Sequence, residues 1–554
     1  MVARVGVPIK TWYITGEVPP PYQYKLSTGD SWIQTVPQLD FRTRQAYASA
    51  SLIPEKSGTY RIYMRQQDEL GRWGEHAVLD ILVAAGEAPV ARWNFSEADG
   101  VAQNSESSST HDATLHDGAV RDDRGRRGTL THDSSGAPLD VPVTDRGLDL
   151  NGTTAYAATG GPVLETRSAY TVSAWARPET ASQDGIVLSQ DGTSYSPFVI
   201  GLDDGHGRWL FGVRGADAPS EEGDYWGVVS DHPATLDVWT HLAATYEPST
   251  GKVSFYVNGK LQGTSTAEGS WSAEGALQVG RYKSGGNHRG YFKGSIDEVA
   301  VWQRALTPQE IADEARLLTS ETYAGAELVA AWDPETATDT AVADTQSGYG
   351  HTLTLTGGAS TDGQAIRLDG IDDAATTQAS IVDSTGSFTV TTAVALDGGE
   401  LISKPTGFTG QVLGQRTADG SAWGFWFELT GKETVLDDTG NESTVPVGVW
   451  HFGRLNSDGT FSSVKSDQAA EMDALTRLTG VYDAQSGEIS LYLGHNQNGD
   501  DTAFTAKLAS GDLTIGRGFT GGVWKHHLPA RVADVRLWVG AMAGVEQVRT
   551  TVGD

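Results

Sequence analysis

The sequence contains a long internal repeat, which restricts the fold strongly because both copies must fold in the same way. Two segments recur at an offset of 218 residues, as from Leu150 to Leu368, and three recur at 236, as from Trp302 to Trp538. The change from 218 to 236 requires a net insertion of 18 residues in the second copy. The paired segments are 150–152 with 368–370, 170–172 with 388–390, 242–246 with 478–482, 279–281 with 515–517, and Trp302 with Trp538.

Residues 294–312 predict how the first copy ends, because a strand-like run leads directly into a short helix. Three β-branched residues between positions 296 and 301 favour the strand. Thr307 can cap the helix, Pro308 suits its first position, and Glu310 completes a capping box. A similar ending recurs near the C-terminus, as expected for a repeated binding module.

Length and composition predict an all-β protein of about three units. Gly 67, Trp 16 and Tyr 18 with only Met 4 favour short strands joined by turns. Before the repeat, residues 60–65 and 77–83 have the clearest strand patterns, and residues 84–89 form a linker rich in Ala, Gly and Pro.

The ending at 294–312 resembles the end of a LamG-like (concanavalin A-like, laminin G type) jelly-roll domain. Residues 239–259 are also similar to two strands of that family, and Asn258-Gly259 signals a hairpin turn. The resemblance implies jelly rolls at 88–320 and 325–554, the second divergent. Residues 1–86 resemble an immunoglobulin-like or fibronectin-III-like β-sandwich, a common spacer. The expected fold class is therefore one Ig-like sandwich followed by two jelly rolls.

The net charge of −31 opposes binding to nucleic acid or anionic lipid and favours cations such as calcium, although solubility also explains it. Cys 0 excludes disulfides and thiolate chemistry. No run of about 18 apolar residues predicts membrane insertion. The start lacks the apolar region of a signal peptide and lies almost inside a strand-like segment, so we expect the chain to be a piece of a longer secreted protein.

The LamG resemblance implies a calcium ion at the sandwich edge, held by the first turn and the closing strand. Since calcium takes six to eight oxygen ligands, backbone carbonyls and water would complete the site. In the alternative interpretation, Asp297 accepts backbone N–H groups and caps a turn. The candidate metal ligands are Glu97, Asn104, Asp297 and Glu298 in the first copy, and Asp333, Glu335, Asp344 and Asp534 in the second.

Aromatic residues in polar, Gly-broken segments could stack on sugar rings, with nearby amides and carboxylates adding polar contacts. The alternative is that they are isolated surface or core side chains, as most of the tryptophans should be. The candidate ligand-binding residues are Tyr195, Tyr225, Trp226, Tyr282, Tyr291, Trp423, Trp524 and His526.

Catalysis is the less favoured interpretation, and we predict no catalytic residues. Glucanases on this fold carry alternating carboxylates on one strand, and the nearest approach, Glu222-Gly-Asp224, lacks the third. No nucleophile elbow, zinc-protease, P-loop or dinucleotide motif is present in the sequence.

The leading hypothesis is a non-catalytic binding or adhesion segment of a secreted or cell-surface bacterial protein. Its expected partners are a glycan or an extracellular protein, together with other domains of the same larger protein. One alternative is a purely structural spacer or assembly region of a larger particle. Another is a set of accessory domains of a glycosidase whose active site lies outside this chain. Fold alone does not decide among them.

Overall fold

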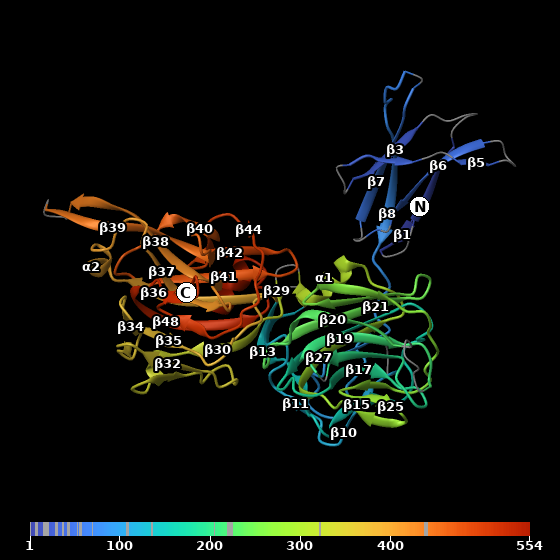
Figure 1. Cartoon of the computed structure of the whole chain (residues 1–554), viewed down its shortest axis with the longest axis horizontal. Helices are drawn as coiled ribbons and strands as arrows, with labels where there is room; N and C mark the ends of the chain where they lie inside the picture. Colours follow the sequence, from blue (N-terminus) through green and yellow to red (C-terminus); the bar gives the residue numbers. More distant parts are fainter. Residues whose placement is uncertain are drawn as a thin grey trace.

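The computed structural model shows a nearly all-β protein (Figure 1), which confirms the predicted all-β class. None of the helices among the described residues is long and apolar enough to cross a membrane. The structure describes residues 2–5, 9–14, 21–27, 31–35, 38–40, 45–52, 54, 58–68, 70–106, 110–133, 137–203, 205–218, 225–320, 323–436 and 441–553. Glu222 and Asp224 lie outside these ranges.

The N-terminal region contains two small sheets. Both predicted strands are present, as β7 and β8, and alternate side chains of β7 are buried in a small core. The first sheet has the order β1 (Val2–Arg4), β8 (Ala77–Ala84), β7 (Gly58–Gln66), β3 (Tyr22–Leu26), β4 (Ile33–Thr35). The second has the order β2 (Ile9–Ile14), β6 (Gln45–Leu52), β5 (Gln38–Asp40).

Two sheets from residues 91–302 face each other across a hydrophobic core, and we call them the first sandwich. The seven-stranded sheet runs β10 (Ala113–His116), β15 (Tyr156–Thr159), β24 (Leu277–Val279), β17 (Gly185–Gln190), β18 (Phe198–Leu202), β19 (Arg208–Arg214), β20 (Tyr225–Pro233). The eight-stranded sheet runs β11 (Val120–Asp122), β14 (Gly147–Asn151), β27 (Lys293–Trp302), β16 (Tyr170–Pro178), β21 (Thr240–Glu247), β22 (Lys252–Val257), β23 (Lys260–Thr266), with β9 (Ala91–Trp93) also on β27.

Residues 327–539 form the second sandwich in the same manner. Its nine-stranded sheet runs β33 (Ser360–Thr361), β34 (Ile366–Asp369), β48 (Pro529–Val539), β36 (Phe388–Leu396), β41 (Thr476–Asp483), β42 (Glu488–Leu493), β43 (Asn496–Gln497), with β30 (Glu327–Trp332) on β48 and β44 (Thr502–Ala503) on β42. Its eight-stranded sheet runs β31 (Ala341–Ala343), β32 (Thr352–Thr356), β35 (Ala374–Thr376), β45 (Leu513–Ile515), β37 (Thr409–Arg416), β38 (Ser421–Leu436), β39 (Glu442–Leu455), β40 (Phe461–Ala469).

The remaining elements are short hairpins and helices outside the main sheets. The hairpins are β12 (Thr129–His132) with β13 (Pro138–Thr144), β25 (Tyr282–Ser284) with β26 (Asn287–Arg289), β28 (Leu318–Ser320) with β29 (Tyr323–Ala324), and β46 (Gly518–Thr520) with β47 (Val523–Lys525). The helices are α1 (Pro308–Arg316), η1 (Pro334–Thr336), α2 (Gly398–Leu401) and α3 (Val545–Val552).

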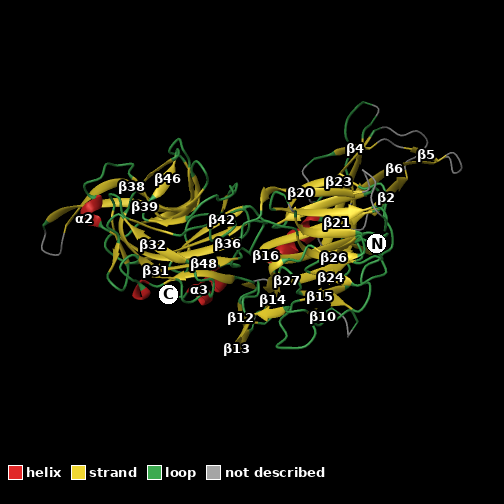
Figure 2. Ribbon diagram, turned by 60° about the horizontal axis from the view of Figure 1, so that its bottom comes forward, coloured by secondary structure: helices red, strands yellow, loops and turns green. Residues whose placement is uncertain are grey.

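The sequence repeat corresponds to a repeated strand order. In both sandwiches the closing strand, β27 or β48, lies between the equivalents β14 and β34 on one side and β16 and β36 on the other. Trp302 pairs with Thr171 and Trp538 with Thr389, which are equivalent positions in the repeat. Each tryptophan is buried under the following helix, α1 or α3. The inserted residues lie mainly in the long β38–β39 hairpin, which extends away from the first sandwich (Figure 2).

The two sandwiches share a tightly packed interface. Trp175, Trp239 and Leu317 of the first part of the chain belong to the hydrophobic cluster of the second sandwich. Apolar packing of this kind favours one fixed arrangement of the two bodies. Polar contacts across the interface join Trp239 to Tyr349, Asn258 to Asp383, Lys260 to Tyr482, Arg316 to Asp483, and Arg126 to the Gly325 carbonyl.

Candidate functional site

A pocket of about 170 Å³ lies on the outer face of the seven-stranded sheet of the first sandwich. Three predicted ligand-binding residues, Tyr195, Tyr225 and Tyr282, line it together. They come from the β17–β18 loop, β20 and β25, so the fold joins segments that are up to about ninety residues apart. The other lining residues are Asp184, Ile186, Ser196, Val199, Leu202, Leu210, Arg214, Lys283 and Ser284.

Strand alternation explains the apolar floor of the pocket. Trp209, Phe211 and Val213 of β19 point into the core, so Leu210 and Arg214 point outward, as side chains on a strand must alternate. Ile186, Val199 and Leu210 form the floor beneath the tyrosines. The prediction did not include these floor residues, although the alternation in residues 208–214 is a signal that could have identified Leu210 and Arg214.

Two glycines allow the tyrosine rings to lie against the backbone. A Cβ atom at Gly212 would lie 2.7 Å from Cε2 of Tyr225, and one at Gly290 would lie 2.7 Å from Cε1 of Tyr282. Both distances are shorter than van der Waals contact. The ring of Tyr225 therefore lies over β19, and 48% of that residue is exposed to solvent.

The loop that carries Tyr195 is held by Asp217, which follows β19. The backbone N–H groups of Thr193, Ser194 and Tyr195 donate to the Asp217 carboxylate at 2.7, 2.9 and 2.7 Å. Burial opposes ionisation of Asp217, but these amides lower its pKa below the ordinary value. The guanidinium of Arg214 lies 4.3 Å from the Tyr195 ring centroid, a cation–π distance.

The rim of the pocket carries fixed charge. The Lys283 ammonium donates to the Gly192 carbonyl at 3.1 Å and lies 3.5 Å from the Asp191 carboxylate. Asp191 is 4% exposed and also contacts His288 at 2.8 Å. An apolar floor, aromatic walls and a few placed charges suit a small hydroxylated ligand, because rings cover its apolar face while rim groups bind hydroxyls.

The other predicted aromatic residues do not join this pocket. Tyr291 bridges to Ile186 beside it without lining it, and Trp226 turns inward to pack against the first core. Trp423 was a candidate ligand-binding residue, but it lies in β38, is 1% exposed and packs on Phe388. Its strand position explains the burial, because it faces the core.

Trp524 and His526 lie in the second sandwich, remote in the fold from the tyrosine pocket. Trp524 packs against Phe519 with ring centroids 4.9 Å apart. His526 contacts Thr409 and Thr520 through its two ring nitrogens at 2.8 and 2.9 Å. Burial lowers the pKa of His526, so its imidazole is neutral at physiological pH.

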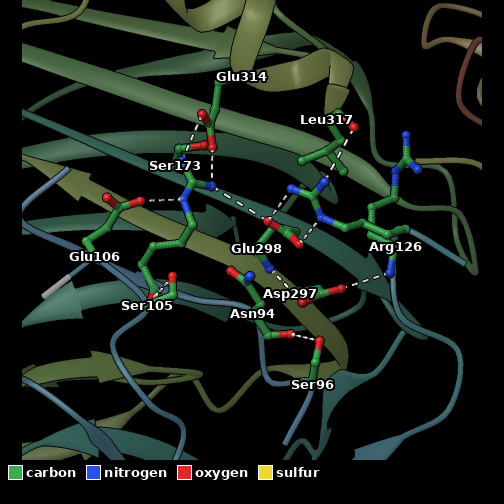
Figure 3. Close-up of polar contacts among 12 residues, drawn as sticks. Asn94, Ser96, Ser105, Glu106, Arg126, Ser173, Asp297, Glu298, Glu314 and Leu317 are labelled. Carbon is green, nitrogen blue, oxygen red and sulfur yellow. Dashed lines mark hydrogen bonds and ion pairs between the residues drawn. The ribbon is translucent and has the colours of Figure 1, made fainter. Parts of the chain in front are cut away.

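Asp297 and Glu298, which Figure 3 shows with their polar contacts, form an acidic cluster with Asp145. The sequence did not identify Asp145. Glu298 is in the left-handed region with φ 49°, at a bulge in β27. The three carboxylates are buried. Burial, and then the charge of Asp145, raise the pKa of Asp297 well above its ordinary value. Burial alone would raise the pKa of Glu298, whereas the Arg127 guanidinium lowers it. The pKa of Glu298 therefore lies below its ordinary value.

Calcium does not fit this cluster, because the carboxylate oxygens already accept from protein donors. Asp297 accepts from the backbone N–H groups of Arg126 and Glu298 at 2.8 and 2.7 Å. Glu298 receives two hydrogen bonds from Arg127, and Asp145 accepts from the Arg127 backbone N–H at 2.8 Å. Guanidinium groups supply the positive charge that calcium would otherwise bring. The alternative interpretation, in which Asp297 caps backbone groups, describes the contacts seen.

The remaining predicted metal ligands stay apart. Glu97 pairs with Arg121, and the Asn104 side chain accepts from a backbone N–H. In the second sandwich, Asp333 caps η1, Asp344 caps the turn at Ser347, and Asp534 pairs with two arginines, while Glu335 is exposed. A second acidic group, which the sequence analysis did not identify, consists of Asp369, Asp372 and Asp373.

Comparison with known proteins gives a match of one segment to a family model. Residues 151–312 match the family model Laminin_G_3, described as the concanavalin A-like lectin/glucanases superfamily. A segment is 29% identical over 136 residues to the human pentraxin-related protein PTX3, covering 23% of this chain and 34% of that protein. The chain thus spans about a third of the length of that curated relative.

Solved structures with similarity to the chain include a domain of an arabinanase, a pentraxin and a sialidase CBM40. Domain 4 of AbnA, a GH43 arabinanase from Geobacillus stearothermophilus in complex with arabinotriose, is 18% identical and covers 42% of this chain and 100% of that chain, with TM-score 0.30. The SAP-like pentraxin of Limulus polyphemus is 21% identical (27% and 72% covered, TM-score 0.23). The Ruminococcus gnavus sialidase CBM40 bound to α2,3 sialyllactose is 15% identical (26% and 82%, TM-score 0.24). The match to the concanavalin A-like lectin/glucanases family model thus covers residues 151–312, and it agrees with the two-sheet β-sandwich observed there.

Proposed function

We propose that this chain is a non-catalytic glycan-binding segment of a secreted or cell-surface protein, and that the tyrosine pocket holds the sugar. The observation that carries the proposal is the convergence of Tyr195, Tyr225 and Tyr282 over an apolar floor. In this proposal residues 1–86 are an Ig-like spacer, and residues 88–320 and 325–554 are two LamG-like units.

The chemistry of the pocket supports one sugar residue as the ligand. The exposed ring of Tyr225 offers a face on which the apolar side of a pyranose can stack. Arg214 and Lys283 can donate to hydroxyl oxygens, and Asp184 can accept from hydroxyl groups. The pocket of about 170 Å³ is small, which favours the end of a glycan chain over an internal segment.

A glycan array followed by calorimetry tests this proposal. Tyr225→Ala and Tyr282→Ala should each weaken binding of an array hit about tenfold, since one stacking contact contributes about 1 kcal/mol. Trp524→Ala, in the second sandwich, is the matched aromatic control and should bind normally. Equal binding by all variants, or an array that stays blank, would reject the pocket as the binding site.

A backbone substitution tests the pocket without removing any side chain that touches the sugar. Gly212→Ala should push the Tyr225 ring away and weaken binding about as much as Tyr225→Ala does. Gly160→Ala is the control, because a Cβ there has open space. If Gly212→Ala leaves binding unchanged, the ring position of Tyr225 does not matter for the ligand.

Calcium remains a proposal only for Asp369, Asp372 and Asp373, an acidic group in which the first two residues are exposed and Asp373 is buried. Binding of calcium there should raise the melting temperature of the second sandwich, because a ligand of the folded state stabilises it. A thermal melt with calcium and with a chelator tests this, and Asp372→Asn is the matched variant. Identical melts would remove calcium from the proposal.

A structural role is the second candidate, and the packed interface favours it. One hydrophobic cluster includes residues of both sandwiches, so the pair can act as a rigid spacer. If glycan arrays are blank while the two sandwiches melt in a single transition, the spacer function is the better description.

A further inference from the structure

The β25–β26 hairpin, which carries Tyr282 and Lys283 of the tyrosine pocket, stands apart from the main sheets. Among the described strands, its two strands pair only with each other. Glycines with positive φ lie at both of its ends, Gly280 at 92° and Gly290 at 61°. Such residues can absorb the backbone rotation of a hinge. The hairpin is therefore a wall of the pocket that can swing as one piece unless other contacts hold it.

The carboxylate of Asp191 holds both strands of the hairpin. Nε2 of His288, on β26, lies 2.8 Å from Oδ2 of Asp191, and Nζ of Lys283, on β25, lies 3.5 Å from the same oxygen. Since a carboxylate only accepts hydrogen bonds, Nε2 of His288 carries the proton. Gln278 of β24 also donates to this oxygen, at 3.0 Å. Asp191 thus joins the hairpin to the seven-stranded sheet.

The surroundings of Asp191 favour the closed position of the hairpin. Asp191 is 4% exposed, and its second oxygen, Oδ1, is buried and has no hydrogen-bond partner among the described residues. A charged hydrogen bond that is shielded from water is stronger than an exposed one. Opening the hairpin would remove two of the three donors to Oδ2, so this contact opposes the movement.

The hairpin also binds the loop that carries Tyr195. The backbone N–H of Gly286 donates to the Ser194 carbonyl at 2.8 Å. In the other direction, the N–H of Ser196 donates to the Lys283 carbonyl at 3.0 Å. Two of the three pocket tyrosines therefore lie on segments that are joined and would move together. The third tyrosine belongs to β20 of the seven-stranded sheet and would stay in place.

We propose that the β25–β26 hairpin is a hinged wall of the tyrosine pocket, and that Asp191 and His288 latch it closed over the ligand. Neither residue lines the pocket, so both are positioning residues that act by holding Tyr282 in place. The proposal rests on the proposed function of the pocket as a sugar site, and it extends that function to the control of ligand release.

Hydrogen–deuterium exchange of the full chain without ligand tests the latch directly. His288→Leu should raise the exchange rate about tenfold in the peptide that covers residues 282–290, because the hairpin then opens more often. His288→Gln keeps a side-chain N–H donor and should restore most of the protection. Exchange in β16 should stay the same in every variant, which separates opening of the hairpin from general destabilisation.

His206→Leu is the matched control for the exchange experiment. It removes a similar histidine–aspartate contact, with Asp203 at 3.2 Å, from the turn between β18 and β19. Residues 282–290 should therefore exchange as in the wild type. The latch is overturned if His288→Leu leaves the exchange of these residues unchanged, or if His206→Leu raises it as much.

The binding kinetics of a glycan-array hit test the link between the latch and the pocket. His288→Leu should release the glycan about fivefold faster, with little change in the association rate, because a wall that opens more often shortens the residence of the ligand. His288→Gln should release it almost as slowly as the wild type. Faster exchange of the hairpin with unchanged release would overturn its role as a wall. A blank array would reject the sugar site rather than the latch, which the exchange experiment supports or overturns by itself.

Discussion

The two sandwiches share a strand order but differ on the outer face of one sheet. In the first, Gly201 pairs with Leu210, and the space above them is the tyrosine pocket. In the second, Trp426 pairs with His451 at the equivalent position of the ladder. Trp426 is 0% exposed, and its indole takes the space that is open in the first sandwich.

The neighbours of Trp426 show how the second face is closed. Phe461 stands where Tyr225 stands in the first sandwich, and its ring centroid lies 6.3 Å from that of Trp426. His451 stacks on Phe461 at 3.9 Å. One duplicated fold thus supports an open pocket in one copy and a packed face in the other, because outer-face residues do not determine the strand order.

Removing the Trp426 indole should abolish the difference between the two outer faces. Of the changes considered, it should have the largest effect on stability. We expect Trp426→Ala to lower the free energy of unfolding by about 4 kcal/mol, since it leaves a large cavity. Urea denaturation measures it, with Tyr225→Ala as the control, whose half-exposed ring should cost less than about 1 kcal/mol. Similar costs for both variants would show that the second face is as open as the first.

The two sandwiches also differ in the strand that pairs with the closing strand. In the second sandwich this strand is β30, which contains Glu327, and in the first it is β9. Burial raises the pKa of Glu327 to about 8. In the unfolded chain the carboxyl ionises near pH 4.5, so stability is full below that pH and falls as pH rises toward 8, by about 4 kcal/mol. β9 carries no carboxylate.

Glu327→Gln should remove that loss of stability between pH 5 and pH 8, as measured by urea denaturation at several pH values. Glu335→Gln, an exposed carboxylate in the same segment, is the control. An unchanged pH profile in Glu327→Gln would show that its carboxyl ionises normally in the folded protein.

A buried glutamine should have the same effect in both sandwiches. Gln190→Ala and Gln415→Ala should each cost about 2 kcal/mol, because each leaves two buried backbone N–H groups without an acceptor. Denaturant unfolding measures both, and a difference above about 1 kcal/mol would contradict their equivalence. The side-chain oxygen of Gln190 accepts from Val163 and Leu164, and that of Gln415 accepts from Ile381 and Val382.

The helix caps should give the smallest effect. α1 has the predicted capping box between Thr307 and Glu310, whereas α3 starts at Gly544 with no side-chain cap. Thr307→Ala should cost about 1 kcal/mol in thermal unfolding. Thr319→Ala, outside the helix, is the control, and equal stabilities would mean that the box contributes little.

Local patterns predicted much of the fold. The capping box, the hairpin turn at Asn258 and Gly259, where both φ angles are positive, and the strands β7 and β8 are confirmed. These features depend on residues close together in the chain, so the sequence displays them directly.

The sites were less predictable, because they join distant segments. The sequence identified Tyr195, Tyr225 and Tyr282 as candidates but not as one pocket. It identified Asp297 and Glu298 but not their partners about 170 residues earlier, which are the backbone N–H of Arg126 and the guanidinium of Arg127. No short-range pattern indicates such pairings.

The sequence by itself determined the all-β architecture, the repeated order of its segments and the helix that ends the first copy. The tertiary structure decided which outer face is open, which carboxylates meet arginines, and how the two sandwiches share a core. The reason is physical. Strand and cap preferences act over a few residues, whereas the space beside Gly201 or Trp426 depends on side chains from several strands that only the folded sheet brings together.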